Sequence, residues 1–235
     1  MADLLLLTPT SRDVERDAVA DAWESAGGEV LRLDRFWEPP TTVDPKTVRI
    51  YGPHTFALVL QEVLPIRLIS PPDDVVLSLP ARFLGREVRR ANLEEVLNST
   101  FPIFVKPLLS KVFAAGLHDS QESLLEETAG LPADTQVIWS EPVQFTAEAR
   151  TFAVDGKALA FAIYEGAVDD EATPRRFAND ALQALPFDGP LTLDIGFIPD
   201  NGWAVVECNE AWGSGLNGCD ASAAIHVIAE ATAAV

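Results

Sequence analysis

Cysteine is scarce in this sequence, with two residues among 235, Cys208 and Cys219. Neither belongs to a CxxC pair, and the three histidines are far from one another along the chain. This pattern excludes a disulfide framework, and it indicates neither a zinc site nor a catalytic histidine. We expect both thiols to be reduced, as in a cytosolic protein.

Basic residues and long apolar runs are also few. The chain has 17 Lys and Arg against 36 Asp and Glu, which gives a formal net charge of -19. Such a charge repels the phosphate backbone, so sequence-independent binding to nucleic acid is not expected. No apolar run is long enough for a membrane span, and the run Leu4–Leu7 is too short for a signal sequence. We therefore expect a cytoplasmic protein that binds neither nucleic acid nor membrane.

The first third of the chain alternates short apolar runs with helical patterns. Val14, Ala18, Ala22 and Ala26 recur every four residues and are followed by two glycines, which predicts a helix with a glycine C-cap. Predicted strands flank this helix and a second, apolar one; they cover Leu4–Leu7, Glu29–Leu33, Val48–Tyr51 and Ile66–Ile69. The pattern predicts a small parallel α/β domain over residues 1–75.

Residues 76–235 have an α+β pattern. Two turn sequences, Asp155-Gly156 and Pro199–Gly202, each separate two apolar runs and predict hairpins. We further expect a polar surface loop over 169–177 and a terminal helix over 221–234.

Residues 76–100 are predicted to be helical and hold the one locally basic stretch, with Arg82, Arg86, Arg89 and Arg90. A solvated face that offsets the acidic bulk explains these arginines. The alternative is that one of them contacts a bound phosphate or substrate.

Three oxygen-bearing side chains lie on the two strands of the second hairpin. Asp194 is in the strand LTLDIGF, and Glu207 and Asn209 are in the strand VVECNE. Residues two apart on a strand face the same side, and cross-strand neighbours lie about 5 Å apart. Oxygen ligands without Cys or His suit Mg²⁺, which often completes its shell with water and nucleotide phosphates. The spacing thus predicts a magnesium site, although acidic residues at strand ends are often only solvated.

Two further features are consistent with a bound anion. Gly213, Ser214 and Gly215 follow the hairpin directly, and the glycines permit a loop whose amides meet an anion. Lys106 ends an apolar strand immediately before Pro107. Such a lysine either extends to the surface or places a point charge on phosphate oxygens.

The segments FVKP, EPVQFTAEARTFAV, LTLDIGF and VVECNEAWGSGL resemble the ATP-grasp superfamily in their order and spacing. The resemblance covers roughly residues 100–220. In D-alanine–D-alanine ligases, two carboxylates seven positions apart contact the adenine and the ribose, and Glu141 and Glu148 match that spacing. An Asp, a Glu thirteen positions on and an Asn two beyond it hold Mg²⁺ in the same ligases, as in the set Asp194, Glu207 and Asn209.

The segments KPLLSKVF and SEPVQFTAEARTFAVDGK further resemble a divergent ATP-grasp clade named for its arginine and two lysines. Arg150 and Lys111 are the residues that carry this resemblance. The clade includes uncharacterised bacterial and phage proteins, and a eukaryotic cell-division-cycle protein that assembles a translation initiation factor. Tyr164 also matches the clade, although we expect it to be an ordinary half-buried strand residue.

The resemblance implies an ATP-grasp fold after the N-terminal domain, with a small subdomain over 101–140 and a large subdomain over 141–235, both α+β, gripping ATP. The implied roles are ATP binding by Lys106, Lys111, Glu141, Pro142, Val143 and Glu148; catalytic contacts by Arg150 and Lys111; Mg²⁺ binding by Asp194, Glu207 and Asn209; and a substrate loop at Gly213, Ser214 and Gly215. For Arg150 the alternative is an ion pair with Glu148.

The resemblance implies a Mg-ATP-dependent ligase that joins a carboxylate to an amine through an acyl-phosphate. Its partners would be a small-molecule or peptide carboxylate and an amine acceptor. Two departures favour an alternative, an ATP-binding assembly factor with a protein partner and no ligase turnover. Thr192 stands where the ligases have an arginine, and the segment 107–116 has a single glycine.

Overall fold

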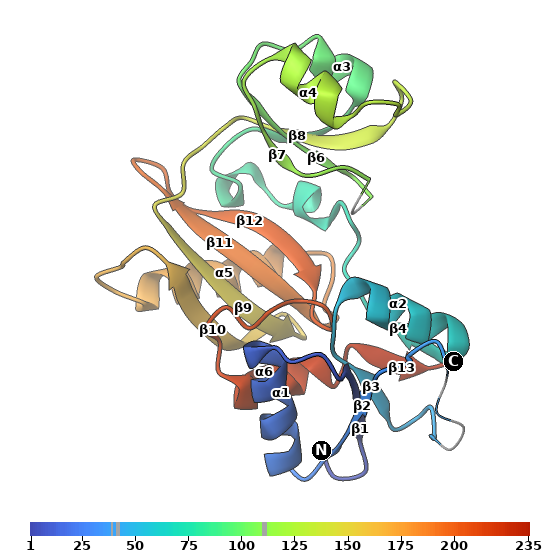
Figure 1. Ribbon diagram of the computed structural model, residues 1–235. Helices are drawn as coiled ribbons and strands as arrows, with labels where there is room; N and C mark the ends of the chain where they lie inside the picture. The colour runs from blue at the N-terminus through green and yellow to red at the C-terminus, as the bar shows by residue number, and fades with distance from the viewer. Residues whose placement is uncertain (39, 41–42, 110–111) are drawn as a thin grey trace.

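The computed structural model describes residues 1–38, 40, 43–109 and 112–235. Three regions follow one another along the molecule: the N-terminal region, a central sheet, and a smaller sheet with two helices (Figure 1). Within the part of the chain that is described, every helix is too short or too polar to cross a lipid bilayer.

The N-terminal region is built on a parallel sheet in the order β2-β1-β3, as predicted. Helix α1 begins after Asp13, whose carboxylate accepts a hydrogen bond from the amide of Arg16. The elements are β1 (Leu5–Pro9), α1 (Val14–Ser25), β2 (Glu29–Leu33), β3 (Val48–Ile50), α2 (His54–Val63) and β4 (Ile66–Leu68).

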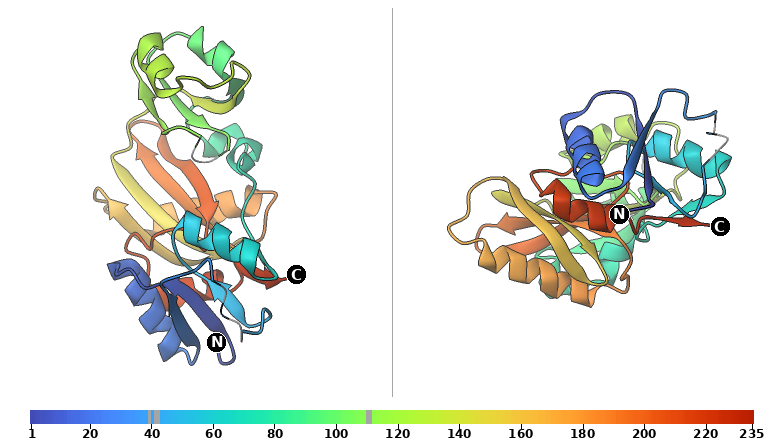
Figure 2. Two further views of the ribbon diagram at one scale, coloured as in Figure 1. Left: turned by 45° about the vertical axis from the view of Figure 1, so that its right-hand side comes forward. Right: turned by 90° about the horizontal axis from the view of Figure 1, so that it is seen from below.

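The end of the chain returns to this region. The predicted helix over 221–234 is wrong in its second half, because α6 (Ala221–Ile228) is followed by β13 (Thr232–Ala234), which pairs antiparallel with β4. Thr232 is buried, and its hydroxyl accepts a hydrogen bond from the amide of Ile50. These long-range bonds outweigh the helical pattern of the terminal alanines. Figure 2 shows the C-terminus beside the N-terminal region.

The small subdomain is an antiparallel sheet in the order β5-β8-β6-β7, with α3 and α4 on its outer face (Figure 1). Val96, Ile103, Val105 and Leu124 form the centre of its core. Its elements are β5 (Val88–Asn92), α3 (Leu93–Leu97), β6 (Ile103–Pro107), β7 (Gly116–His118), α4 (Gln121–Glu127) and β8 (Gln136–Ser140).

The helix predicted over 76–100 is wrong. That stretch holds two short 3₁₀ helices, η1 (Val75–Ser78) and η2 (Ala81–Phe83), then β5 and the five-residue α3. Pro80 precedes η2, and Gly85 has a positive φ of 63° that a helix does not allow. The helical pattern therefore continues only in α3.

The large subdomain is an antiparallel sheet in the order β10-β9-β11-β12. Both predicted hairpins are confirmed, and Asp155, Gly156, Asp200 and Gly202 have the positive φ that such tight turns require. Its elements are β9 (Ala147–Val154), β10 (Lys157–Glu165), α5 (Ala172–Ala184), β11 (Leu191–Ile198) and β12 (Gly202–Glu210).

The polar loop predicted over 169–177 is only partly right, because α5 already begins at Ala172. The carboxylate of Asp170 accepts hydrogen bonds from the amides of Ala172 and Thr173 and so satisfies two free donors of the first turn.

One hydrophobic core joins the N-terminal region to the large subdomain. Helix α6 packs against α1 on one side and against β9 and β10 on the other. Trp23, Phe152, Trp212 and Ile225 are buried in the same cluster, although they are far apart in sequence. The boundary predicted at residue 75 therefore lies beside a shared core, and the domain limits stay a prediction.

Candidate functional site

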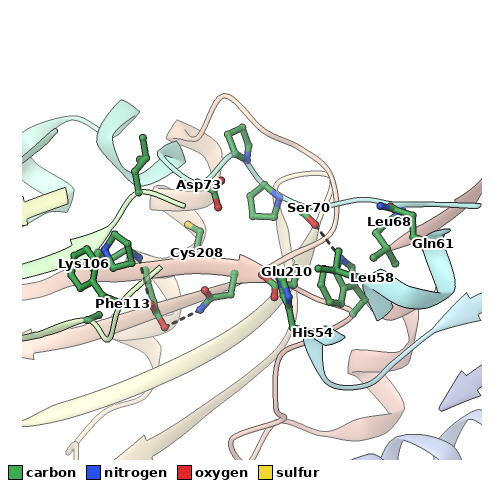
Figure 3. Close-up of a pocket in the computed structure, with 18 residues that line it drawn as sticks. His54, Leu58, Gln61, Leu68, Ser70, Asp73, Lys106, Phe113, Cys208 and Glu210 are labelled. Carbon is green, nitrogen blue, oxygen red and sulfur yellow. Dashed lines mark hydrogen bonds and ion pairs between the residues drawn. The ribbon is translucent and has the colours of Figure 1, made fainter. Parts of the chain in front are cut away.

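Two cavities meet at Lys106 and Glu207. We call the first the hinge cavity; it has a volume of about 280 Å³ and lies between the small and large subdomains. The second, the large cavity, has a volume of about 500 Å³ and extends from Lys106 to α2 of the N-terminal region (Figure 3). A molecule longer than either cavity could therefore pass these two side chains.

The hinge cavity has apolar walls and a backbone edge. Its apolar side chains come from both sheets and from the segment that joins them: Phe104, Leu117, Pro142, Val143, Phe145 and Val206. The carboxylate of Glu141 accepts a hydrogen bond from the amide of Glu87 at 2.8 Å, and the amide of Glu141 donates to the carbonyl of Glu87 at 3.0 Å. The segment 141–143 is thereby held at the edge of a flat apolar slot.

Arg86 is the one member of the basic stretch that lines the hinge cavity. Its guanidinium donates to the Ser140 hydroxyl at 3.0 Å and to the carbonyls of Leu84 and Val205, each at 2.9 Å. Burial lowers the pKa of Arg86 from its ordinary value, but an arginine stays charged at neutral pH. Arg86 thus links β8 to β12 across the cavity floor.

Lys106, Glu207 and Asn209 are brought together from β6 and β12. Lys106 Nζ lies 3.7 Å from Glu207 Oε2, and Asn209 Nδ2 donates to Glu207 Oε1 at 2.8 Å. Asp194 of β11 is the cross-strand partner of Glu207. The three predicted metal ligands therefore gather at one end of the β11–β12 hairpin, with the predicted phosphate-binding lysine above them.

Arg150 pairs with Asp194 rather than with Glu148. Its Nε and Nη2 donate to the two carboxylate oxygens of Asp194 at 2.8 and 2.5 Å, and both side chains are buried. Burial alone would lower the pKa of Arg150, but the hydrogen bonds and charge of Asp194 raise it above its ordinary value. Burial raises the pKa of Asp194, and the guanidinium opposes that shift. The pair is therefore a charged, bidentate bridge between β9 and β11.

Glu148 has a partner that the sequence did not indicate. The hydroxyl of Tyr164 donates to Glu148 Oε2 at 2.6 Å across the β9–β10 pair. Burial and this hydrogen bond raise the pKa of Tyr164, so the phenol keeps its proton and remains a donor. Tyr164 is partly buried, as expected, and it also orients the carboxylate predicted to bind ribose.

The loop Gly213–Asn217 is fixed by side chains from three regions. Glu15 of α1 accepts hydrogen bonds from the amides of Leu216 and Asn217 at 3.0 and 2.7 Å. The Tyr51 hydroxyl donates to the carbonyl of Ser214 at 2.8 Å. Arg150 Nη1 donates to the carbonyl of Gly215 at 2.9 Å. The predicted substrate loop is therefore a preformed element.

Glu15 and Tyr51 were not singled out by sequence reasoning. They lie about 160 to 200 positions from the loop along the chain, and no local motif marks them. Thr192, which stands where the related ligases have an arginine, shares a hydrogen bond of 2.9 Å with the Ser214 hydroxyl. It supports the loop instead of supplying a charge.

We expect Glu15→Ala to release the loop. Two amides lose a charged acceptor, and hydrogen bonds to charged groups contribute about 1.5–3 kcal/mol. Amide hydrogen exchange at Leu216 and Asn217 should accelerate about tenfold or more. Glu24→Ala, at the exposed end of α1, is the matched control and should leave both amides unchanged. Equal exchange in the two variants would contradict the role of Glu15.

Two observations bear on a metal ion. Lys111 lies outside the described residues. Among the residues that are described, no group of three or more His, Cys, Asp and Glu side chains is placed to hold a metal ion. The predicted set has only two carboxylates, and its third member is the Asn209 amide. Any ion here would need oxygens from water or from a bound nucleotide.

Solved structures with the same fold cover nearly the whole chain. The D-cycloserine synthetase DcsG aligns with a TM-score of 0.63 and 16% identity over 97% of this chain and 99% of that chain. A RimK-domain ATP-grasp protein from Sphaerobacter thermophilus gives 0.61 and 15% over 96% and 97%. The ATP-grasp ligase PsnB, in complex with a minimal precursor, Mg and ADP, gives 0.57 and 12% over 97% of each chain. These likenesses show the fold.

No curated protein is significantly similar to the chain in sequence. A family model matches residues 83–227, more than half of the chain, and it describes an ATP-grasp domain of family 2 in the clade of one arginine and two lysines. The ATP-grasp fold and the resemblance to that clade are thus both confirmed. The chain belongs to this second family of the arginine-and-two-lysine clade of ATP-grasp domains.

Proposed function

We propose that the protein is a Mg-ATP-dependent ligase that joins a carboxylate to an amine. One observation carries this proposal: Lys106 and Glu207 stand between an apolar slot and a larger cavity that reaches the N-terminal region. A nucleotide base fits the slot, and its phosphates would end beside the larger cavity, where an acceptor would wait.

The nucleotide would make three kinds of contact. The base would lie among the apolar walls of the hinge cavity, with backbone groups of Glu141–Val143 at its edge. Glu148, oriented by Tyr164, would accept hydrogen bonds from the ribose hydroxyls. Lys106 would neutralise phosphate charge, and Lys111 would add a second cation by resemblance.

The donor set suits Mg²⁺. Asn209 binds Glu207 through its NH₂ group, which leaves its amide oxygen available. Each carboxylate oxygen of Asp194 accepts one bond from Arg150 and retains a second lone pair. These oxygens, with phosphate and water, would complete a hard-ligand shell. A bound Mg²⁺ would offset the negative charge that develops on the transferring phosphoryl group.

The proposed reaction has two steps. A substrate carboxylate oxygen attacks the γ-phosphorus, ADP leaves, and an acyl-phosphate forms. The amine nitrogen then attacks the acyl carbon, inorganic phosphate leaves, and the amine loses a proton as the amide forms. Lys106 would hold the phosphates in line, and the loop Gly213–Gly215, fixed by Glu15 and Tyr51, would bound the acyl group.

Calorimetric titration of ATP with and without Mg²⁺ tests the site. We expect binding that needs Mg²⁺ and is weakened about tenfold or more in Lys106→Ala and in Glu207→Gln, since each removes a charged contact. Lys157→Ala, at an exposed hairpin position, is the matched control. No binding by the unaltered protein at millimolar Mg-ATP would refute the proposal. An acceptor screen for ADP release then tests turnover.

An ATP-binding assembly factor is the second candidate. The bidentate Arg150–Asp194 pair favours it, because a predicted metal ligand is already fully engaged by a protein cation. Such a protein would bind Mg-ATP and a protein partner but would release no ADP with any carboxylate and amine. Acceptor-dependent ADP release would exclude it.

A further inference from the structure

The large cavity has a wall that lies outside the family's shared domain. The family match begins at residue 83, whereas one side of this cavity is formed by α2 and by the segment 68–73. In Figure 3, Lys106 and Phe113 lie at one end of the cavity, and Leu58 and Gln61 lie toward the other. The cavity therefore joins the predicted phosphate position to a surface that belongs to this chain.

Charge in the large cavity favours a cation. Asp73, Glu207 and Glu210 line it, and Lys106 is the one Lys or Arg among the described lining residues. Lys106 pairs with Glu207, which leaves the other two carboxylates without a partner cation in the lining that is described. An anionic ligand would be repelled here, and an ammonium group would be attracted.

Glu210 is the carboxylate best placed to bind such a group. It is half-buried and directly follows Asn209 on β12. Its side chain takes part in no hydrogen bond or ion pair with any residue that the structure describes. In Figure 3 it lies midway along the cavity, close to His54. A ligand group at Glu210 would therefore be near the predicted metal ligands.

The far wall is apolar and rigid. Leu58 is 40% exposed although it is a large hydrophobic side chain, and Leu68 lies beside it. The indole of Trp212 is fixed, because its Nε1 donates to the Ser70 hydroxyl at 3.0 Å and its ring packs on His54 at 5.4 Å. These side chains offer an apolar surface to the part of a ligand beyond Glu210.

We infer that the large cavity binds the amine substrate, a small primary amine with an apolar side chain. Its ammonium group would pair with Glu210, and its side chain would pack against Leu58 and Trp212. The volume of about 500 Å³ lies within the usual range for small-molecule sites. This inference rests on the proposed ligase function, and it assigns the choice of amine to residues of the N-terminal region.

The Trp212 indole N–H is a site-specific reporter. The chain has five tryptophans, and loss of one signal in Trp212→Phe identifies the relevant resonance in a ¹H–¹⁵N spectrum. With Mg²⁺ and a non-hydrolysable ATP analogue present, we would titrate L-leucinamide and, separately, N-acetyl-L-leucine. Both probes carry the same apolar side chain, but one is a cation and the other an anion. We expect saturable shifts of the Trp212 signal with the amine only.

Two variants place the amine. Glu210→Gln should weaken L-leucinamide binding about tenfold, because it removes a charge-assisted contact without changing the shape of the side chain. Glu126→Gln removes the same charge from an exposed position on α4 and should leave the affinity unchanged. Equal weakening in both variants would show attraction by net charge alone and would overturn the inference.

The remaining outcomes also decide the question. A response to N-acetyl-L-leucine that equals or exceeds the response to L-leucinamide would overturn the inference, as would no response to either probe. Failure of the ligase proposal is read separately, from the absence of Mg-ATP binding in calorimetry. Normal Mg-ATP binding without amine binding would refute this inference alone.

Discussion

Replacing Arg150 with methionine is expected to lower the free energy of unfolding by about 3–5 kcal/mol, because it leaves Asp194 charged and buried without its partner. Asp194 is 2% exposed, and both of its carboxylate oxygens accept bonds from the guanidinium. Asp194→Leu should cost a similar amount for the converse reason. Urea unfolding followed by circular dichroism measures both.

The double variant separates the ion pair from packing. When both charges are removed, no unpaired charge is left, so Arg150→Met with Asp194→Leu should be clearly more stable than either single variant. Arg12→Met breaks an exposed ion pair with Asp17 and should cost less than about 1 kcal/mol. If the two single effects simply add in the double variant, the buried pair is not the source of the loss.

Replacing Trp23 with alanine is expected to destabilise the whole molecule by about 3–5 kcal/mol. The Trp23 side chain is fully buried, and its indole covers Gly28, where an added Cβ would lie 2.3 Å from Nε1. The surrounding cluster also contains Phe152 of the large sheet and Ile225 of α6. The N-terminal region and the large subdomain should therefore unfold together.

Trp37→Ala is the matched control for this substitution. Trp37 is 56% exposed, so its loss should cost less than about 1 kcal/mol. Urea unfolding should be followed both by circular dichroism and by the fluorescence of the remaining tryptophans. Coincident transitions at a lower midpoint are expected for Trp23→Ala. A separate early transition that reports only the N-terminal region would show that the shared core does not couple the two parts.

The sequence predicted best where the structure is local. The β11–β12 hairpin brings Asp194 within pairing distance of Glu207 through a turn of a few residues, so spacing alone placed them together. The helix predicted over 76–100 fails because β5 is held by β8, more than forty residues away. A strand that depends on a distant partner has no local pattern that distinguishes it from a helix.

The partner of Arg150 shows the same limit within the site. The β9–β11 register places Arg150 opposite Asp194, and that pairing joins strands separated by β10 and α5. Sequence reasoning offered Glu148 instead, because it lies two residues away on the same strand. Glu15 and Tyr51 reach the loop Gly213–Asn217 only after α1 and β3 have packed on the shared core.

The ATP-grasp family and the order of its ligand residues could be identified without coordinates, because short motifs on single hairpins carry both. The partners of those residues emerged only once the chain was folded. Asp194 is bound by Arg150, Glu148 is bound by Tyr164, and the N-terminal region forms one wall of the large cavity. The physical reason is that contacts between distant segments depend on strand order and on shared burial, and neither leaves a periodic signal in the chain.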